Sequence, residues 1–272
     1  MEKWYENGYL LPRNICNMCQ IPTVLRARAF RLYLTNGKRL VDLWLNGGAA
    51  IMGHTPPNLL RELKNTASRG LYAPYPHFTE GRFLKALAKL FPGYSFRIFA
   101  SPPNELTALF YNGTAKLWRP FCNPAAPFET DDTALFVPVL PGIQTWRDGL
   151  PLGLCLAAAK SETLLAQLPE SDSLPPIQLA TAARGVHDLL AARERANPSL
   201  PRITKALQNS PWQHGGVYLN LKEKPTSEKW ETLFRQFLEA GFLLPPTPAH
   251  PLILPGEMSA GEENKLANLL NS

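Results

Sequence analysis

Proline and glycine divide this chain into short apolar segments, and this division limits the folds that the chain can adopt. The 272 residues include 27 prolines and 18 glycines. The prolines are scattered through periodic segments, which excludes a low-complexity chain and predicts many stiff, short connections. The longest near-apolar stretches, Thr133–Pro141 and Leu150–Ala159, are too short to span a bilayer. We therefore expect one or two compact domains without membrane contact.

Composition narrows the class further. The chain is 45% hydrophobic and 18% charged, which is too apolar for a disordered protein. The net charge of +6 is spread along the chain, and the cluster Arg26, Arg28 and Arg31 is too small for a nucleic-acid surface. The segment Met1–Glu6 has no apolar signal-peptide core behind it. We expect a cytoplasmic protein without a nucleic-acid partner.

The cysteines predict no metal centre. Cys16 and Cys19 form a lone C-x-x-C, whereas a zinc site needs a second pair or histidines at suitable spacing. Reduced, packed thiols are the favoured interpretation, and a redox pair is the alternative.

Local signals predict an α/β chain. Residues 30–45 read as a hairpin that turns at Asn36-Gly37. Thr55 is the expected N-cap of a helix with Pro56 at its first position, and Ser259 with Glu262 forms a capping box for the last helix. The remaining pattern predicts helices over Thr79–Phe91, from Asn104, over Pro176–Ala196 and over Thr226–Ala240, and strands over Phe96–Ala100, Thr133–Leu140, from Leu150, and over Gly216–Leu221, Phe242–Leu244 and Leu252–Leu254.

Several motifs in this order carry a family resemblance. They are the hairpin with its Val41-Asp42 pair, the run Gly53-His54-Thr55-Pro56-Pro57, the segment Leu150-Pro151-Leu152-Gly153, and the C-terminal stretch from Glu239 to Leu270. Together they resemble class III aminotransferases, the fold-type I pyridoxal-phosphate (PLP) enzymes, and most closely the glutamate semialdehyde aminomutases. Order and spacing carry this resemblance over most of the chain.

The resemblance implies a reduced fold-type I PLP-transferase-like three-layer core, with a small α+β lobe built from the two termini. The expected division is residues 1–60 with 198–272 for the lobe and residues 61–197 for the core. The chain is far shorter than the family, and we place the loss between about Trp118 and Thr133, where a proline-rich linker stands. The family also implies a homodimer.

The residues that would make the cofactor site are degenerate. The expected Schiff-base lysine falls at about Gln144, and the nearest alternatives are Lys116 and Lys160. The phosphate-binding turn is matched by Ser101-Pro102-Pro103 with Asn104 and Glu105, where proline removes two amides. An aspartate partner for the pyridinium nitrogen has no good match. Ser171 matches a threonine that touches the partner's phosphate in the family, and a helix cap is its expected role here.

These losses favour a protein that has lost transamination, acts as a dimeric binding or assembly module, and needs no cofactor. The alternative is an active PLP enzyme in which Lys116 or Lys160 forms the imine. A further alternative is non-covalent binding of a small carboxylate. Its candidate pocket residues are His54, Tyr72, Tyr75, His77 and Arg97.

Overall fold

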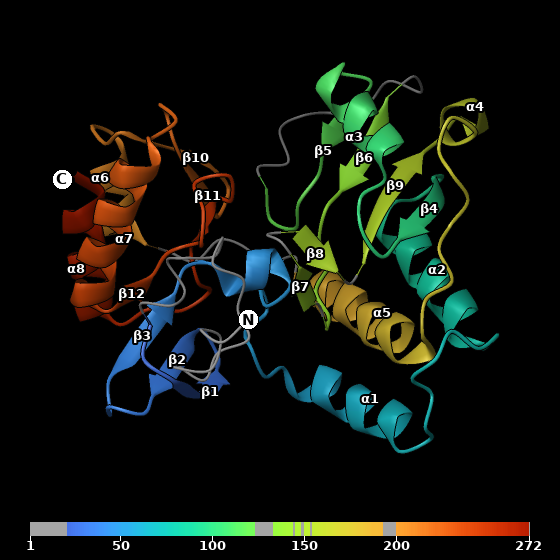
Figure 1. Ribbon diagram of the computed structural model, residues 1–272, viewed down its shortest axis with the longest axis horizontal. Coiled ribbons are helices and arrows are strands. Elements are labelled where there is room, and N and C mark those ends of the chain that lie inside the picture. Colours follow the sequence, from blue (N-terminus) through green and yellow to red (C-terminus); the bar gives the residue numbers. More distant parts are fainter. Residues whose placement is uncertain are drawn as a thin grey trace, which may run out of the picture.

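The computed structural model describes residues 21–122, 133–143, 145–147, 150–152, 154–192 and 200–271. Cys16, Cys19 and Gln144 lie outside these residues, as does most of the linker before Thr133. The elements form a mixed α/β fold with separate sheets (Figure 1). The expectation of an α/β chain with a reduced three-layer core and a smaller α+β lobe is confirmed.

One lobe combines both ends of the chain. Its first sheet has the order β1-β2-β3-β12, and its second has the order β10-β11-β13. The strands are β1 (Val24–Arg28), β2 (Arg31–Leu34), β3 (Arg39–Asp42), β10 (Trp212–Gly215), β11 (Tyr218–Leu221), β12 (Phe242–Leu243) and β13 (Leu252–Ile253). The helices are α6 (Pro201–Leu207), α7 (Ser227–Ala240) and α8 (Ala260–Asn271). A single buried cluster joins them, with Phe234, Phe237 and Phe242 among its largest side chains.

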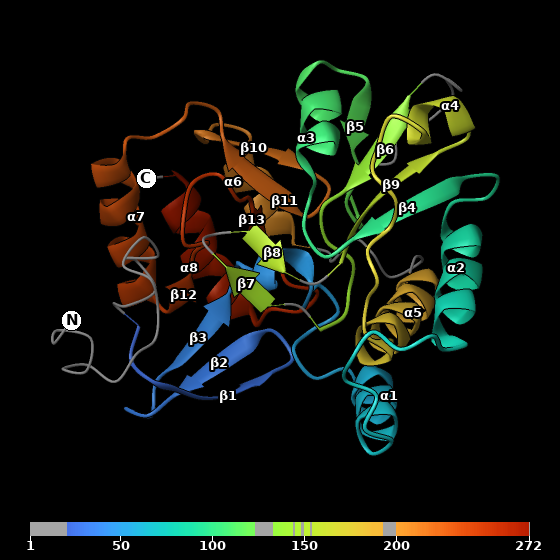
Figure 2. The same cartoon turned by 45° about the vertical axis from the view of Figure 1, so that its right-hand side comes forward.

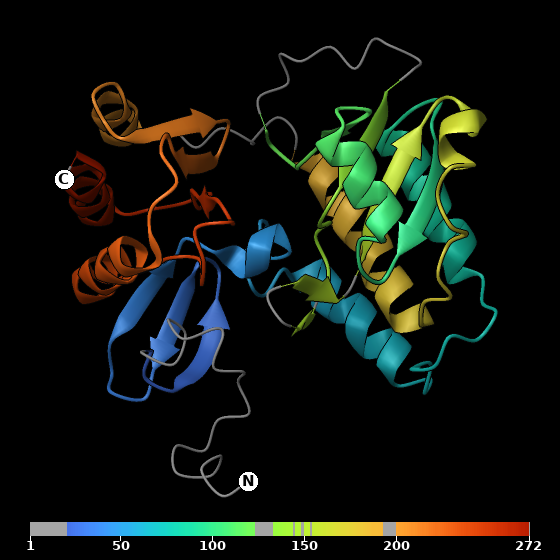
Figure 3. The same ribbon diagram turned by 45° about the horizontal axis from the view of Figure 1, so that its top comes forward.

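The other part is a three-layer core. Its sheet has the order β4-β9-β6-β5, formed by β4 (Ser95–Phe99), β9 (Cys155–Ala159), β6 (Ala134–Val137) and β5 (Ala115–Leu117). Helices α2 (Thr79–Leu90) and α5 (Pro176–Ala191) share one buried cluster with the sheet, whereas α3 (Asn104–Tyr111) and α4 (Glu162–Leu165) pack on the other face (Figure 3). Alternate residues of β4, β6 and β9 belong to the two clusters, because successive side chains of a strand point to opposite faces.

Two elements connect these parts. Helix α1 (Pro57–Ala67) packs on α5. The short hairpin β7 (Thr145–Arg147) and β8 (Leu150–Leu152) lies between the lobe and the core (Figures 1 and 2). The boundaries at residues 60 and 198 stay a prediction.

The hairpin turn and the last helix form as predicted, but the start of α1 does not. Gly37 has a φ of 76° between β2 and β3, which pair as antiparallel strands. Helix α1 begins at Pro57, and Pro56 before it is extended (φ −63°, ψ 126°). The predicted Thr55 cap is therefore wrong. Because a residue that precedes proline is pushed out of the helical region, the second proline, and not the first, takes the first helical position.

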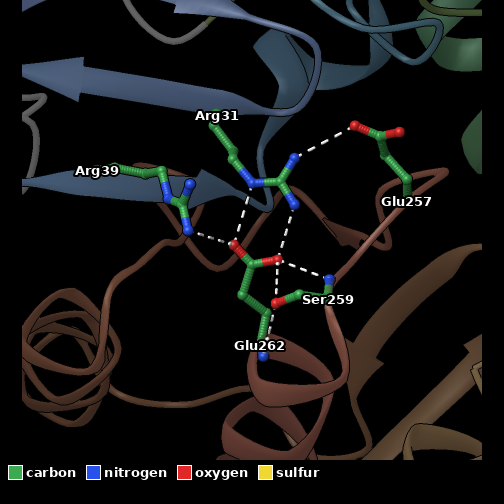
Figure 4. Close-up of polar contacts among 5 residues, drawn as sticks. All are labelled: Arg31, Arg39, Glu257, Ser259 and Glu262. Carbon is green, nitrogen blue, oxygen red and sulfur yellow. Dashed lines mark hydrogen bonds and ion pairs between the residues drawn. The ribbon is translucent and has the colours of Figure 1, made fainter.

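Glu262 anchors the last helix to the opening hairpin (Figure 4). The Arg31 guanidinium donates to both of its carboxylate oxygens at 3.0 and 2.7 Å. The predicted capping box is present, since Ser259 N donates to Glu262 Oε2 at 2.8 Å and Glu262 N donates to Ser259 Oγ at 3.3 Å. The hydrogen bonds from Arg31, opposed by partial burial, lower the pKa of Glu262 from 4.5 to about 2.

This carboxylate makes folding stability depend on pH. Because the folded pKa lies below the unfolded one, its contribution is present above pH 4.5 and is lost as the pH falls toward 2. After allowance for solvent screening, we expect the stability difference between the wild type and Glu262→Gln to shrink by about 1 kcal/mol between about pH 6 and about pH 3. Urea unfolding at both pH values measures it.

Glu257 supplies the control for this measurement. Its carboxylate also contacts Arg31, at 3.3 Å, but its side chain is 64% exposed. Glu257→Gln should therefore change stability by less than about 0.5 kcal/mol at either pH. An equal pH dependence in both variants would contradict the role assigned to Glu262.

Candidate functional site

The carboxyl edge of the core sheet is where the sequence places the cofactor site. Strands β5 and β6 are parallel, and both β4 and β6 are antiparallel to β9, so the carboxyl ends of β4, β5 and β6 meet at one edge. Ligands of open α/β sheets bind outside this edge. The segment Ser101–Pro103 follows β4 here, and Pro141–Ile143 follows β6.

A cavity of about 150 Å³ lies beside this edge, between the segment that follows β3 and the core. Pro141, Gly142 and Ile143 line it on one side. The segment after β3 lines it on the other, through Asn46, Ala49, Ala50, Met52, Gly53 and His54. Gly142 N donates to Ala49 O at 3.3 Å, which ties the two walls together. Gln144, where the lysine is expected, follows this wall directly, and none of the described lining residues is a lysine.

Helix α5 closes the cavity through a contact that only glycine permits. A Cβ placed on Gly185 would lie 2.0 Å from the carbonyl oxygen of Pro141. The helix therefore touches the Pro141–Gly142 backbone directly. Asp188, one turn further along α5, also lines the cavity.

Asp42 organises the opposite wall. It is 2% exposed, and its Oδ1 accepts hydrogen bonds from the amides of Trp44 and Leu45 at 2.8 and 3.0 Å. These bonds hold a turn in which Leu45, Asn46, Gly47 and Gly48 all have positive φ, at 47°, 51°, 66° and 109°. Such a left-handed run is costly for the non-glycine residues, so it forms only where the surroundings impose it.

Asp42 also fixes His54. Its Oδ2 lies 2.9 Å from His54 Nε2, and the His54 side chain is 16% exposed. Because a carboxylate only accepts hydrogen bonds, this contact places the proton on Nε2. The other ring nitrogen, Nδ1, has no hydrogen-bond partner among the described residues. The site therefore combines an oriented imidazole with a cavity lined by both polar and apolar residues.

The other predicted pocket residues do not gather around His54. Tyr75 and His77 line a second cavity of about 220 Å³ with Ser171 and Asp172. Tyr72 is 60% exposed, and its hydroxyl donates to Ala67 O. Ile98 of β4 packs with α2 and α5, whereas Phe99 packs with α3; by strand alternation Arg97 lies on the α3 face.

Ser171 does not cap a helix. Helix α5 begins at Pro176, with Pro175 as its N-cap. The hydroxyl of Ser171 instead accepts a hydrogen bond from Ile98 N at 3.0 Å, and Asp172 accepts one from Ala100 N at 2.8 Å. The predicted cap is wrong because two polar side chains here bind the free edge of β4.

The residues of the phosphate-binding turn do not fit a PLP phosphate. Helix α3 begins at Asn104, with an extended Pro103 before it. Pro102 and Pro103 have no N–H to donate to an anion. Ser101 is half-buried, and Asn104 and Glu105 are exposed.

Both alternative lysines are exposed. Lys116 is exposed on the edge strand β5. Lys160 follows Ala159, which pairs with Ser95 at the amino end of β4. It is exposed, and its Nζ lies 5.9 Å from the centre of the Tyr94 ring. Lys160 is thus at the edge of the sheet opposite to Ser101.

One basic residue at the carboxyl edge escaped the sequence analysis. Arg119 follows β5, and its guanidinium lies 5.4 Å from the centre of the Tyr218 ring. The Tyr218 hydroxyl donates to Pro120 O at 2.7 Å, which joins the core to the small lobe. Burial lowers the pKa of Arg119. No sequence signal marks this contact, because it joins residues far apart in the chain.

Two classes of site or segment are not found in the described part of the chain. It holds no cluster of three or more histidine, cysteine, aspartate or glutamate side chains that could bind a metal ion. None of its helices has the length and hydropathy needed to cross a membrane.

Comparisons with known proteins agree with this fold. The fold matches an ornithine aminotransferase from Toxoplasma gondii ME49 with a TM-score of 0.62 and 12% identity, over 98% of this chain and 91% of that one. A segment is 31% identical over 72 residues to a glutamate-1-semialdehyde 2,1-aminomutase of Lysinibacillus sphaericus (strain C3-41), covering 26% of this chain and 17% of that protein. The chain thus has the fold of class III aminotransferases, and the resemblance is confirmed.

A nearer relative places it more closely. An uncharacterised protein of Treponema pallidum (strain Nichols) is 30% identical, over 85% of this chain and 88% of that protein. The chain belongs to the same family as that protein. No protein-family model matches the chain.

Proposed function

We propose that this chain is a non-catalytic protein on an aminotransferase fold, which acts as a dimeric binding or assembly module and uses no PLP. One structural observation carries the proposal: the carboxyl edge offers prolines at 102 and 103 where amides are needed. The sequence agrees with it, since the family resemblance expects the lysine at about Gln144. Without a lysine amine, no imine can form at this position.

Two features support the assembly part of this proposal. Strand β5 is an edge strand with Leu117 39% exposed, and Tyr75 and Phe78 are 58% and 59% exposed. Unpaired strand edges and exposed aromatic side chains favour association. The free thiols Cys122 and Cys155 agree with a cytoplasmic location. Sedimentation analysis should give a dimer, and a monomer at all concentrations would oppose it.

The alternatives make different demands on the geometry. An active enzyme with a relocated lysine would need Lys116 or Lys160 to face the site at the carboxyl edge. Lys160 follows the end of β9 at the opposite edge, and Lys116 is exposed on the edge strand β5. A carboxylate site made by His54, His77 and Arg97 would need the three residues in one place. His54 lines one cavity and His77 the other, and Arg97 lies on the α3 face of the sheet.

A PLP titration tests the loss of cofactor chemistry. We expect no new near-visible absorbance band, and no reduced lysine adduct after borohydride treatment and mass spectrometry of the peptides. A matched variant, Gln144→Lys, restores an amine but leaves both prolines, so it should still bind PLP poorly. Adding Pro102→Gly and Pro103→Thr to that variant should improve binding. A single trapped lysine in the wild type would overturn the proposal.

A further inference from the structure

We propose that β1, the outer strand of the small lobe, binds an acidic extended segment of a partner protein by strand addition. The proposal names a partner class for the binding role proposed above and rests on that role. It uses residues that take no part in the PLP argument, so it can fail while the loss of cofactor chemistry stands.

One edge of β1 is open. The sheet order β1-β2-β3-β12 makes β1 an end strand, and among the described strands it pairs with β2 alone. In an antiparallel pair, alternate residues direct their N–H and C=O groups away from the neighbouring strand. These groups of β1 form a row with which a further strand can pair. Val24 and Leu25, at the start of β1, are 41% and 68% exposed, which leaves apolar contact area beside this row.

Two arginines of β1 carry an unbalanced positive charge. Arg26 and Arg28 are exposed, and neither forms an ion pair with a described residue. Arg26 lies opposite Tyr33 of β2, and its guanidinium is 4.5 Å from the centre of that ring. Arg28 lies opposite Arg31. Directly opposed residues share a face of the sheet, so these arginines lie on one face.

The acidic side chains at this face serve the inner arginines. Glu262 lies 2.7 Å from Arg31 and 3.8 Å from Arg39, and Glu257 lies 3.3 Å from Arg31 (Figure 4). The positive charge of β1 is thus left for an anionic partner. A second copy of β1 would bring arginines next to arginines, and like charges on paired strands are destabilising. An acidic strand from another protein is therefore favoured over self-pairing.

Strand alternation sets the side-chain pattern of the partner. Arg26 and Arg28 are two residues apart and point to one face, whereas Ala27 between them packs against the buried cluster of the lobe. A strand beside β1 should therefore place acidic residues at alternate positions, with apolar residues between them. Two arginines are too few for a nucleic-acid surface, and the open backbone groups suit a peptide strand.

The test is a titration of the full chain into a fluorescein-labelled peptide that alternates glutamate and valine, followed by fluorescence anisotropy. We expect saturable binding with a Kd of about 0.1 mM, as suits a short exposed strand. The affinity should fall about fivefold between about 50 mM and about 500 mM NaCl. Amide hydrogen exchange in β1 should slow on binding, because strand addition gives these amides partners. A peptide of the same composition with its glutamates in one block should bind at least about fivefold more weakly.

Charge reversal locates the contact. Arg26→Glu combined with Arg28→Glu should weaken binding of the acidic peptide about tenfold and should bind the matching lysine–valine peptide instead. Lys85→Glu combined with Lys89→Glu is the matched control. It changes the net charge equally at exposed positions of helix α2 and should leave binding unchanged.

Peptide N-methylation separates strand pairing from simple charge attraction, and it needs no protein variant that could fail to fold. One peptide is methylated at every glutamate amide and the other at every valine amide. Only one of these two sets of amides faces β1 in a strand pair, so one peptide should lose binding and the other should keep it. No saturable binding, equal effects of the two methylations, equal losses in the two double variants, or equal affinity for a uridine oligonucleotide would each overturn the proposal.

Discussion

Gly185→Ala should lower the free energy of unfolding by about 3 kcal/mol or more, a large effect for a single methyl group. The added Cβ would lie 2.0 Å from the oxygen and 2.7 Å from the carbon of the Pro141 carbonyl. These are backbone atoms, so no side-chain rotation relieves the overlap, and α5 must separate from the segment that lines the cavity. Urea denaturation followed by circular dichroism measures the loss.

Gly81→Ala is the matched control, since Gly81 also lies within a helix. A Cβ there meets nothing within 4 Å. Alanine should therefore stabilise α2 by about 0.5–1 kcal/mol through its better helix propensity. If the two variants changed stability equally, the direct contact between α5 and Pro141 would be disproved.

Local sequence signals predicted the elements that local physics controls. The Asn36-Gly37 turn and the Ser259–Glu262 capping box were predicted correctly because each needs only residues close together in the chain. The start of α1 was misplaced by one residue, since two successive prolines, Pro56 and Pro57, compete for one position. Order and spacing of such segments then sufficed for the fold class.

The candidate site could be predicted only in part. The motif resemblance drew attention to His54, but not to Asp188 or Gly185, which reach the same cavity from a distant helix. Segment matching also cannot assign a side chain to a face. Arg97 was grouped with His77, yet strand alternation separates them, and Ser171 was taken for a cap although its partner is Ile98, 73 residues away.

Asp42→Ala should cost about 3–5 kcal/mol, the largest loss expected for a polar residue in the described chain. The buried carboxylate satisfies the amides of Trp44 and Leu45 and the ring of His54. Its removal takes away the carboxylate that these donors share and releases the left-handed turn over residues 45–48. Denaturant unfolding of the variant measures the cost.

Asp42→Asn separates the structural role of Asp42 from its effect on His54. The asparagine oxygen can still accept from both amides, so we expect a loss of only about 1–2 kcal/mol. Its Nδ2 would donate to His54 Nε2, which moves the ring proton to Nδ1. The His54 nitrogen chemical shifts of the folded variant should therefore report the other tautomer, and nitrogen-15 NMR of the imidazole measures them. Unchanged nitrogen shifts in this variant would show that the Asp42 contact does not set the tautomer of His54.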